Sequence, residues 1–202
     1  MSGEGVERLL ELLVSRGGGQ YGYEPVSQLA HALQAASLAE AAGEGAPLVA
    51  AALLHDLGHL VDGSEVARLA RGEDDHHELR ALRLLKREFG AAVVEPVRLH
   101  VQAKRYLCAL EPGYLAALSE ASRASLAVQG GVMSADEAAA FIRLPQAQAA
   151  LRLRRYDDQA KDPSARSPEA DHFLPHLRRA QAETWTPAAT PDSLSAQTGA
   201  TP

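Results

Sequence analysis

Six of the eight histidines in this 202-residue chain lie between His31 and His100. Imidazole nitrogens and carboxylate oxygens are the usual protein ligands of first-row transition metals. Six such side chains lie on, or at the edge of, different expected helices. These candidate ligands are His31, His55, Asp56, His77, His100 and Asp158. Helical bundles build metal centres from inward-facing side chains of several helices, so this set predicts a metal site. Four histidines and two aspartates suffice for two metal ions with an aspartate bridging them.

The context of the His55-Asp56 pair strengthens this prediction. A His-Asp dipeptide alone is weak evidence for a site, because a chain with 8 histidines and 10 aspartates contains one by chance a substantial fraction of the time. Here the pair follows the apolar run from Ala50 to Leu54, so two polar groups emerge directly from a buried surface. Unpaired polar groups are costly there, which favours a bound partner. Three further histidines, His76, His172 and His176, are interpreted as hydrogen-bonded or solvent-exposed. The lesser alternative for His172 and His176, which are four residues apart, is a metal pair on one helix face.

Basic side chains also accompany the expected ligands. Three of them lie one helical turn from a ligand and hence on the same helix face: His59, Lys104 and Arg155. They would give an acidic protein, with net charge -6, a local site for an anion. Solvated lysine and arginine are the alternative. Three polar residues at helical spacing, Ser122, Ser125 and Gln129, are candidate ligand contacts, with capping or helix–helix hydrogen bonds as the alternative.

Periodicity predicts helices throughout. Apolar residues recur at helical spacing over about 5–16, 26–42, 47–60, 64–71, 75–89, 96–110, 113–128, 135–142, 145–161 and 168–183. No strand pattern competes, and an aromatic content of 4% favours close helix packing. We expect an all-α helical bundle forming a single domain over residues 1–183. Residues 184–202 are rich in Thr, Pro, Ala and Ser and predict a disordered tail.

Composition excludes several classes of partner. The negative net charge argues against nucleic acid, because phosphate backbones require a basic face. The longest apolar stretch, 46–60, is too short to span a membrane. A single cysteine and the lack of an apolar leader predict the cytoplasm. We expect a monomer or a small homo-oligomer that acts on a small molecule.

Several sequence motifs resemble those of a known family. The run Leu53-Leu54-His55-Asp56-Leu57-Gly58-His59 resembles the core of the HD-domain superfamily. The order His, His-Asp, His, His, Asp is similar to its di-iron oxygenase branch. That branch includes myo-inositol oxygenase and bacterial enzymes that cleave the carbon–phosphorus bond of 1-hydroxyphosphonates. Resemblance to the phosphonate-cleaving group covers about residues 21–161, and its segments are 21–34, 74–78, 100–107, 118–131 and 155–161.

The resemblance implies particular cofactors and roles. It implies two iron ions, as a mixed Fe(II)/Fe(III) pair, in an HD-domain helical bundle with a dinuclear site. Their ligands would be His31, His55, Asp56, His77, His100 and Asp158, with Asp56 bridging. Phosphonate contacts would be His59, Lys104, Ser122, Ser125, Gln129 and Arg155. Tyr21, aided by Glu24, would occupy the second iron until substrate displaces it, and His59 and Lys104 would also serve catalysis.

The implied reaction is an oxygen-dependent cleavage in organophosphonate catabolism. It would convert 2-amino-1-hydroxyethylphosphonate, or its trimethylammonium analogue, to phosphate and glycine or glycine betaine. Tyr21, Tyr23 or Glu24 would meet the cationic end of the substrate, by cation–π contact or by charge. The sequence departs from the pattern of the phosphonate-cleaving group at two positions. Tyr156 stands in place of a tryptophan, and Ser125 stands where threonine is also found. These departures leave the choice of substrate open.

Other functions remain as alternatives. A metal-dependent phosphohydrolase acting on a nucleotide or another phosphate ester would use similar ligands, but it assigns no role to Tyr21 and Glu24. A polyol oxygenase is disfavoured by the phosphonate-type segments. A sensory domain with a degenerate site would ordinarily have lost a ligand, and none is lost here.

Overall fold

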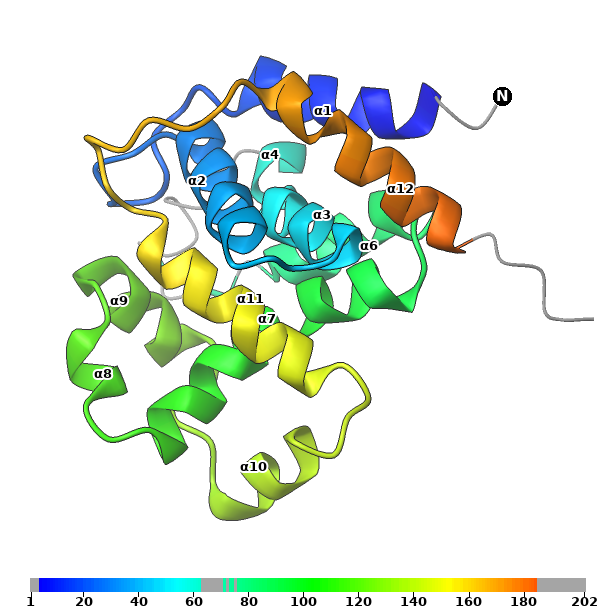
Figure 1. The fold of residues 1–202 in the computed structure, drawn as a ribbon. Helices are drawn as coiled ribbons and strands as arrows, with labels where there is room; N and C mark the ends of the chain where they lie inside the picture. The colour runs from blue at the N-terminus through cyan, green and yellow to red at the C-terminus, as the bar shows by residue number, and fades with distance from the viewer. Residues whose placement is uncertain (1–3, 63–70, 72, 75, 185–202) are drawn as a thin grey trace, which may run out of the picture.

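The chain is seen in a computed structural model that describes residues 4–62, 71, 73–74 and 76–184 (Figure 1). Within these ranges the ordered elements are helical, with one isolated bridge between Gln20 and Ser27, which confirms the all-α prediction. The elements are α1 (Glu4–Arg16), α2 (Gln28–Ala41), α3 (Ala46–Leu54), α4 (His59–Asp62), α6 (His77–Leu85), α7 (Ala91–Leu110), α8 (Tyr114–Ala117), α9 (Glu120–Val128), α10 (Ala135–Phe141), α11 (Ala147–Gln159), the 3-10 helix η1 (Ala170–Phe173) and α12 (Leu174–Thr184).

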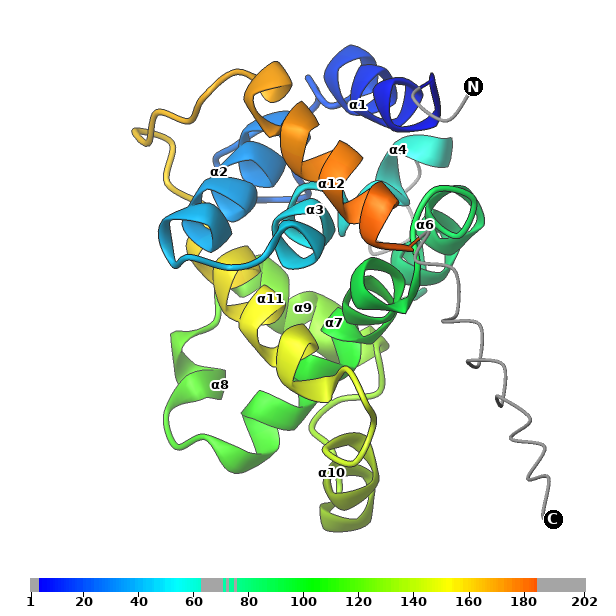
Figure 2. The same ribbon diagram turned by 45° about the vertical axis from the view of Figure 1, so that its right-hand side comes forward.

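Helix α3 lies at the centre of the fold. It is built almost wholly of alanine, leucine and valine, and nearly all of it is buried. Helices α2, α7, α11 and α12 all pack against it, and its alanines let their backbones approach closely. α1 lies above α3 and α11 below it in both ribbon views (Figure 1, Figure 2). An apolar helix that is buried on every side gives the site a rigid platform.

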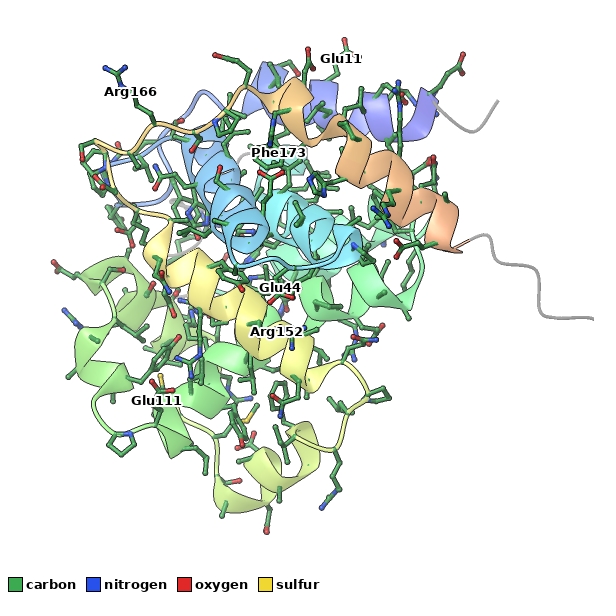
Figure 3. The ribbon with its side chains drawn as sticks, in the orientation of Figure 1. Glu11, Glu44, Glu111, Arg152, Arg166 and Phe173 are labelled. Carbon is green, nitrogen blue, oxygen red and sulfur yellow. The ribbon has the colours of Figure 1, made fainter. Side chains whose placement is uncertain are left out.

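The longest helix, α7, packs along α11 and carries a second apolar cluster. That cluster joins Leu99, Ala103 and Leu107 of α7 to Phe141 of α10 and Ala150 of α11. On the opposite side of the molecule, the fully buried Phe173, which Figure 3 labels, ends η1 directly before α12 and belongs to the main core. The α7–α11 pair therefore forms one wall of the site and α2–α3 the other.

Two expected helices are each divided in the structure. The prediction of one helix over 47–60 is wrong, because α3 ends at Leu54 and a turn precedes α4. The helix expected over 113–128 breaks at Leu118, where Ser119 caps α9 by accepting a hydrogen bond from Ser122 N at 3.1 Å. The helix expected from Pro96 begins earlier, at Ala91.

The other described helices match their predicted positions with shifted ends. Most of the helix expected over 64–71 and of the tail expected over 184–202 lies outside the described residues. No helix in the described ranges combines the length and apolar character that crossing a membrane requires.

Candidate metal centre and anion pocket

The turn after α3 delivers the first two candidate ligands. It is held by the backbone bonds Leu57 N to Leu54 O (3.1 Å) and His59 N to Asp56 O (3.0 Å). Gly58 lets this turn press against the start of α6, because a Cβ at Gly58 would lie 1.9 Å from the carbonyl oxygen of His77. Only glycine permits such an approach, so the glycine of the His-Asp-Leu-Gly-His run sets the distance between two ligand-bearing segments.

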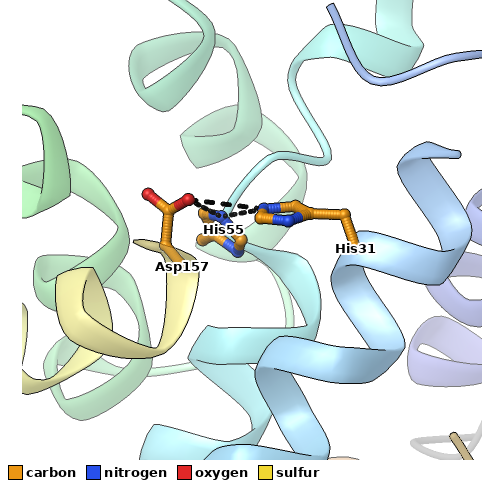
Figure 4. A group of neighbouring side chains, drawn as sticks. All are labelled: His31, His55 and Asp157. Atoms are coloured by element: carbon orange, nitrogen blue, oxygen red, sulfur yellow. Dashed lines mark hydrogen bonds and ion pairs between the residues drawn. The ribbon is translucent and has the colours of Figure 1, made fainter. Parts of the chain in front are cut away.

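Two histidines and an aspartate meet on one side of the centre. His31 comes from α2, His55 from the end of α3 and Asp157 from α11 (Figure 4). The two Nε2 atoms are 3.2 Å apart, and Asp157 Oδ1 lies 3.5 Å from His31 Nε2 and 3.9 Å from His55 Nε2. All three side chains are buried.

A second pair of imidazoles lies across Asp56. His77 and His100 have their Nε2 atoms 3.0 Å apart. Asp56 Oδ1 is 3.4 Å from His77 Nε2 and 3.6 Å from His100 Nε2. Its other oxygen, Oδ2, is 3.3 Å from His55 Nε2 and 3.6 Å from His31 Nε2. Each oxygen of one carboxylate therefore faces its own pair of imidazoles.

Backbone carbonyls orient three of these rings. Ala160 O accepts from His31 Nδ1 at 2.8 Å, Ala52 O from His55 Nδ1 at 2.9 Å, and Val97 O from His100 Nδ1 at 2.7 Å. Because a carbonyl only accepts, each Nδ1 carries the hydrogen, and in the neutral ring Nε2 presents its lone pair to the centre. Metal-binding histidines are held in this way.

The donor set fits metal ions. Ligand atoms bound at about 2.0–2.2 Å to one ion lie roughly 3–3.5 Å from each other, which is near the separations found here. Both oxygens of Asp56 and Asp157 Oδ1 are buried without a hydrogen-bond partner in the described residues. Burial lowers the pKa of His31 to about 4 and that of His100 well below its usual value. At His55 the carboxylates of Asp56 and Asp157 outweigh burial and raise the pKa to about 9. A bound cation would satisfy the unpaired carboxylate oxygens.

The assignment of Asp158 as a ligand needs correction. Its neighbour Asp157 faces the histidines, whereas the Asp158 carboxylate accepts from the Tyr114 hydroxyl and from Arg154. A difference of one residue turns a helical side chain by about 100°, which moves Asp158 off the ligand face.

The same shift applies to Arg155. Its side chain is exposed and pairs with Glu111 at 2.6 Å, outside the cavity. The preceding residue, Arg154, is 4% exposed and lines the cavity. Sequence reasoning therefore missed both Arg154 and Asp157.

Three cationic side chains, Lys104, Arg154 and Lys161, line a pocket beside the candidate metal centre, and four carboxylates line it too, those of Glu24, Glu73, Asp74 and Asp157. Lys104 Nζ donates to Ser125 Oγ at 2.7 Å, and Lys161 Nζ donates to Ser122 Oγ at 2.8 Å. These four residues and Arg154 line one cavity, and so do the predicted contacts His59 and Gln129. Burial, followed by the charge of Arg154, lowers the pKa of Lys104 to about 7. Lys161 is the last residue of the family-like segment 155–161, and its place in the pocket was not predicted from the sequence.

His59 links the pocket to the second imidazole pair. Its ring stacks on that of His77, with centroids 4.0 Å apart, and its Nε2 lies 3.9 Å from Asp56 Oδ1. Asp56, His59 and His77 together could hold an ion. The geometry is therefore compatible with His59 as a ligand as well as with its predicted substrate contact.

The segment from Tyr21 to Glu24 lies against His31 of the first imidazole pair. The Tyr21 ring stacks on His31 with centroids 4.0 Å apart and planes 15° from parallel. The buried Glu24 carboxylate accepts from Lys161 Nζ at 2.9 Å and from the Ser119 hydroxyl. Both residues line the cavity, so the structure brings the two predicted residues to the centre. Tyr23 lines it too, with 58% of its surface exposed.

The remaining histidines lie away from the centre. His172 and His176 contact the Glu40 carboxylate, each with a shortest separation of 2.8 Å, and His76 pairs with Asp74 at 3.1 Å. Their interpretation as hydrogen-bonded histidines is confirmed.

Comparison with known proteins decides the family. The HD domain model matches residues 29–136, which is more than half of the chain. The chain belongs to the HD-domain family. It is 42% identical over 172 residues to hydroxymethylphosphonate dioxygenase of Gimesia maris, covering 85% of both proteins. It is 38% identical over 164 residues to [1-hydroxy-2-(trimethylamino)ethyl]phosphonate dioxygenase (glycine-betaine-forming) of Leisingera caerulea, covering 81% of this chain and 84% of that relative.

These relatives confirm the predicted place of the chain within the HD-domain family. Both are named as dioxygenases of small hydroxyphosphonates, and each match covers more of the chain than the HD-domain match does. The resemblance to the phosphonate-cleaving group, inferred from short segments, thus holds over most of the sequence.

Proposed function

We propose that this HD-domain protein is an iron-dependent oxygenase that cleaves the carbon–phosphorus bond of a small 1-hydroxyphosphonate. The observation that carries the proposal is the position of Asp56, whose two oxygens each face a pair of imidazoles beside a basic pocket. The names of both curated relatives support this activity, whereas the phosphohydrolase alternative is not favoured.

The proposed centre holds two iron ions. His31, His55 and Asp157 would bind one, His77 and His100 the other, and Asp56 would bridge them. When bound, iron supplies the redox chemistry by which dioxygen reacts with the substrate. The reaction balances without a further reductant: the hydroxyphosphonate and one O2 give a carboxylic acid and phosphate. Carbon is oxidised as its bond to phosphorus breaks, and both oxygen atoms are consumed.

The protein binds and orients the anion. We propose that Lys104, Arg154 and Lys161 hold the phosphonate oxygens, with Ser122 and Ser125 completing the subsite. Buried cations stabilise the charge of the departing phosphate more strongly than solvated ones do. His59 and Gln129, which line the same cavity, would also face the substrate.

We further propose that Tyr21 and Glu24 form a movable cover. The Tyr21 ring stacks on a candidate ligand, and Glu24 accepts from a lysine of the anion subsite. A phosphonate that attracts Lys161 would compete with Glu24 for it and release the cover. The covered pocket would keep water from the reacting atoms.

Three candidate substrates differ at the end remote from phosphorus. They are hydroxymethylphosphonate, 2-amino-1-hydroxyethylphosphonate and its trimethylammonium analogue. Glu24 is engaged by Lys161, so Tyr23 and Tyr21 are the remaining predicted partners for a cationic end. The predicted cytoplasmic location and monomeric or small oligomeric state stay predictions.

Phosphate release tests the proposal. The iron-loaded protein is given each of the three compounds, with oxygen and strictly without it. We expect release only with oxygen, loss of release in His55→Ala, and a preference among the substrates. Oxygen-independent phosphate release from nucleotides would overturn the oxygenase proposal and favour a hydrolase.

A further inference from the structure

The guanidinium of Arg154 is held from several directions. Nη1 donates to Asp157 Oδ2 at 2.7 Å, and Nη2 donates to Asp158 Oδ1. Nε points to the Tyr114 hydroxyl at 3.3 Å, and Nη2 also lies 3.5 Å from Ser122 Oγ. An arginine fork has five donors in a rigid plane, so contacts on three of its nitrogens fix both its position and its tilt.

Two of these partners lie outside the pocket. The residues that line the cavity include Arg154, Ser122 and Asp157 but neither Tyr114 nor Asp158. Tyr114 begins the short helix α8, and its hydroxyl donates to Asp158 Oδ2, which leaves the hydroxyl oxygen to accept from Arg154. Tyr114 and Asp158 therefore contact each other, and both contact the guanidinium of Arg154.

These contacts determine how many oxygens of Asp157 the guanidinium of Arg154 binds. An arginine beside a lone carboxylate tends to bind both oxygens side by side. Here Asp158 and Tyr114 occupy Nη2 and Nε, and only Nη1 binds Asp157. Asp157 Oδ1 is left without a hydrogen bond and faces His31, while Nη2 reaches toward Ser122 in the anion subsite.

We infer that Tyr114 and Asp158 are a positioning pair that holds Arg154 toward the anion subsite and keeps one oxygen of Asp157 open to metal. The inference rests on the proposed function, because that function makes the pocket an anion subsite beside a metal ligand. It also explains the paired aspartates of α11: the first faces the histidines and the second holds the arginine.

Tyr114→Phe is the main test, because it removes one hydroxyl and leaves the charge of the site unchanged. The probe is inorganic phosphate, whose dissociation constant is measured by calorimetry on the iron-loaded protein. Loss of one buried hydrogen bond should weaken phosphate binding by about three- to tenfold. The KM for hydroxyphosphonate should rise by a similar factor while kcat changes less. Tyr106→Phe, on α7 and away from the pocket, should match the wild type.

Asp158→Asn separates positioning from simple charge. If Asp158 acted only by its charge, its removal would strengthen binding of an anion. If it positions Arg154, phosphate binding weakens although a negative charge has been lost. Iron content should fall in Asp158→Asn, because Arg154 can then cover both oxygens of Asp157, but it should fall further in Asp157→Asn, which removes the ligand itself.

Unchanged or tighter phosphate binding in both Tyr114→Phe and Asp158→Asn would overturn the inference. So would loss of iron from Asp158→Asn equal to that from Asp157→Asn. If hydroxyphosphonates are cleaved but both variants bind phosphate like the wild type, only the positioning inference fails. If both variants weaken phosphate binding but the wild type cleaves no hydroxyphosphonate, the pair stands and the proposed reaction fails.

Discussion

Arg154 and Asp157 lie one turn apart on α11 and share a hydrogen bond of 2.7 Å between Nη1 and Oδ2. This buried contact joins the anion pocket to the candidate metal centre. Although burial lowers the pKa of Arg154, the carboxylates of Asp157 and Asp158 outweigh it and hold that pKa well above its usual value. The guanidinium therefore stays charged wherever the protein is folded.

Replacing Arg154 should chiefly impair substrate binding. We expect Arg154→Gln to lower kcat/KM for a hydroxyphosphonate by about a hundredfold, because a charged hydrogen-bond donor is lost from a buried site. Arg155→Gln is the matched control, since its exposed ion pair with Glu111 lies outside the pocket. Steady-state kinetics on both variants checks this, and equal losses would contradict the corrected register of α11.

Gly58 should be intolerant of any side chain. Gly58→Ala would place Cβ against the His77 carbonyl, so the turn and α6 must separate and His77 must shift. We expect lower iron content and a lower melting temperature. Gly18→Ala is the control, because a Cβ there meets nothing within 4 Å. Unchanged iron binding in Gly58→Ala would show that this close approach does not set the centre.

Lys104 should make anion binding depend on pH. Its pKa is lowered to about 7, and a phosphonate favours the protonated form. Phosphate affinity should therefore fall as pH rises through and above about 7. In Lys104→Arg the guanidinium stays charged, so this fall should be much smaller. Calorimetry of phosphate binding over a pH series checks the difference, and identical profiles would exclude Lys104 as its source.

The lowered pKa of Lys104 should also make the stability of the fold depend on pH. The folded state binds fewer protons than the unfolded state between pH about 7 and the ordinary lysine value of 10.5. The Lys104 contribution to the free energy of unfolding should thus rise with pH across that window. Denaturant titrations of the wild type and Lys104→Met measure it, and the rise should be smaller in the variant.

Metal content should distinguish the two candidate carboxylate ligands. Asp56 faces both imidazole pairs and Asp157 only one, so Asp56→Asn should lose more iron than Asp157→Asn. Iron should also stabilise the wild type by about 3–4 kcal/mol at a hundred to a thousand times its dissociation constant. Metal analysis and thermal unfolding with and without a chelator provide the readouts. Equal iron loss in the two variants would argue against a bridging Asp56.

Much of the centre could be predicted because its residue types are unusual in a core. His31, His55, Asp56, His77 and His100 stand out against apolar helices, and the structure brings them together. Residue type alone could not show which of the adjacent aspartates, Asp157 or Asp158, faces the histidines. The helical phase held the needed signal: buried positions Ala147, Ala150 and Leu151 continue in steps of three or four to Arg154 and Asp157.

The breaks within the expected helices 47–60 and 113–128 were harder to predict. The turn after Leu54 interrupts a sequence that reads as continuous helix, because the packing of Gly58 against His77 involves a segment distant in sequence. The role of Tyr114 likewise depends on where the loop after α7 returns to α11. Such contacts are set by tertiary packing and leave no local pattern.

Isotope labelling tests the central claim most directly. The iron-loaded protein converts the preferred hydroxyphosphonate under oxygen-18 gas, and the carboxylate product is examined by mass spectrometry. The account predicts one oxygen-18 atom in that carboxylate, because carbon gains an oxygen as its bond to phosphorus breaks. A carboxylate without label, or phosphate release that takes its oxygen from water with no need for dioxygen, would contradict it.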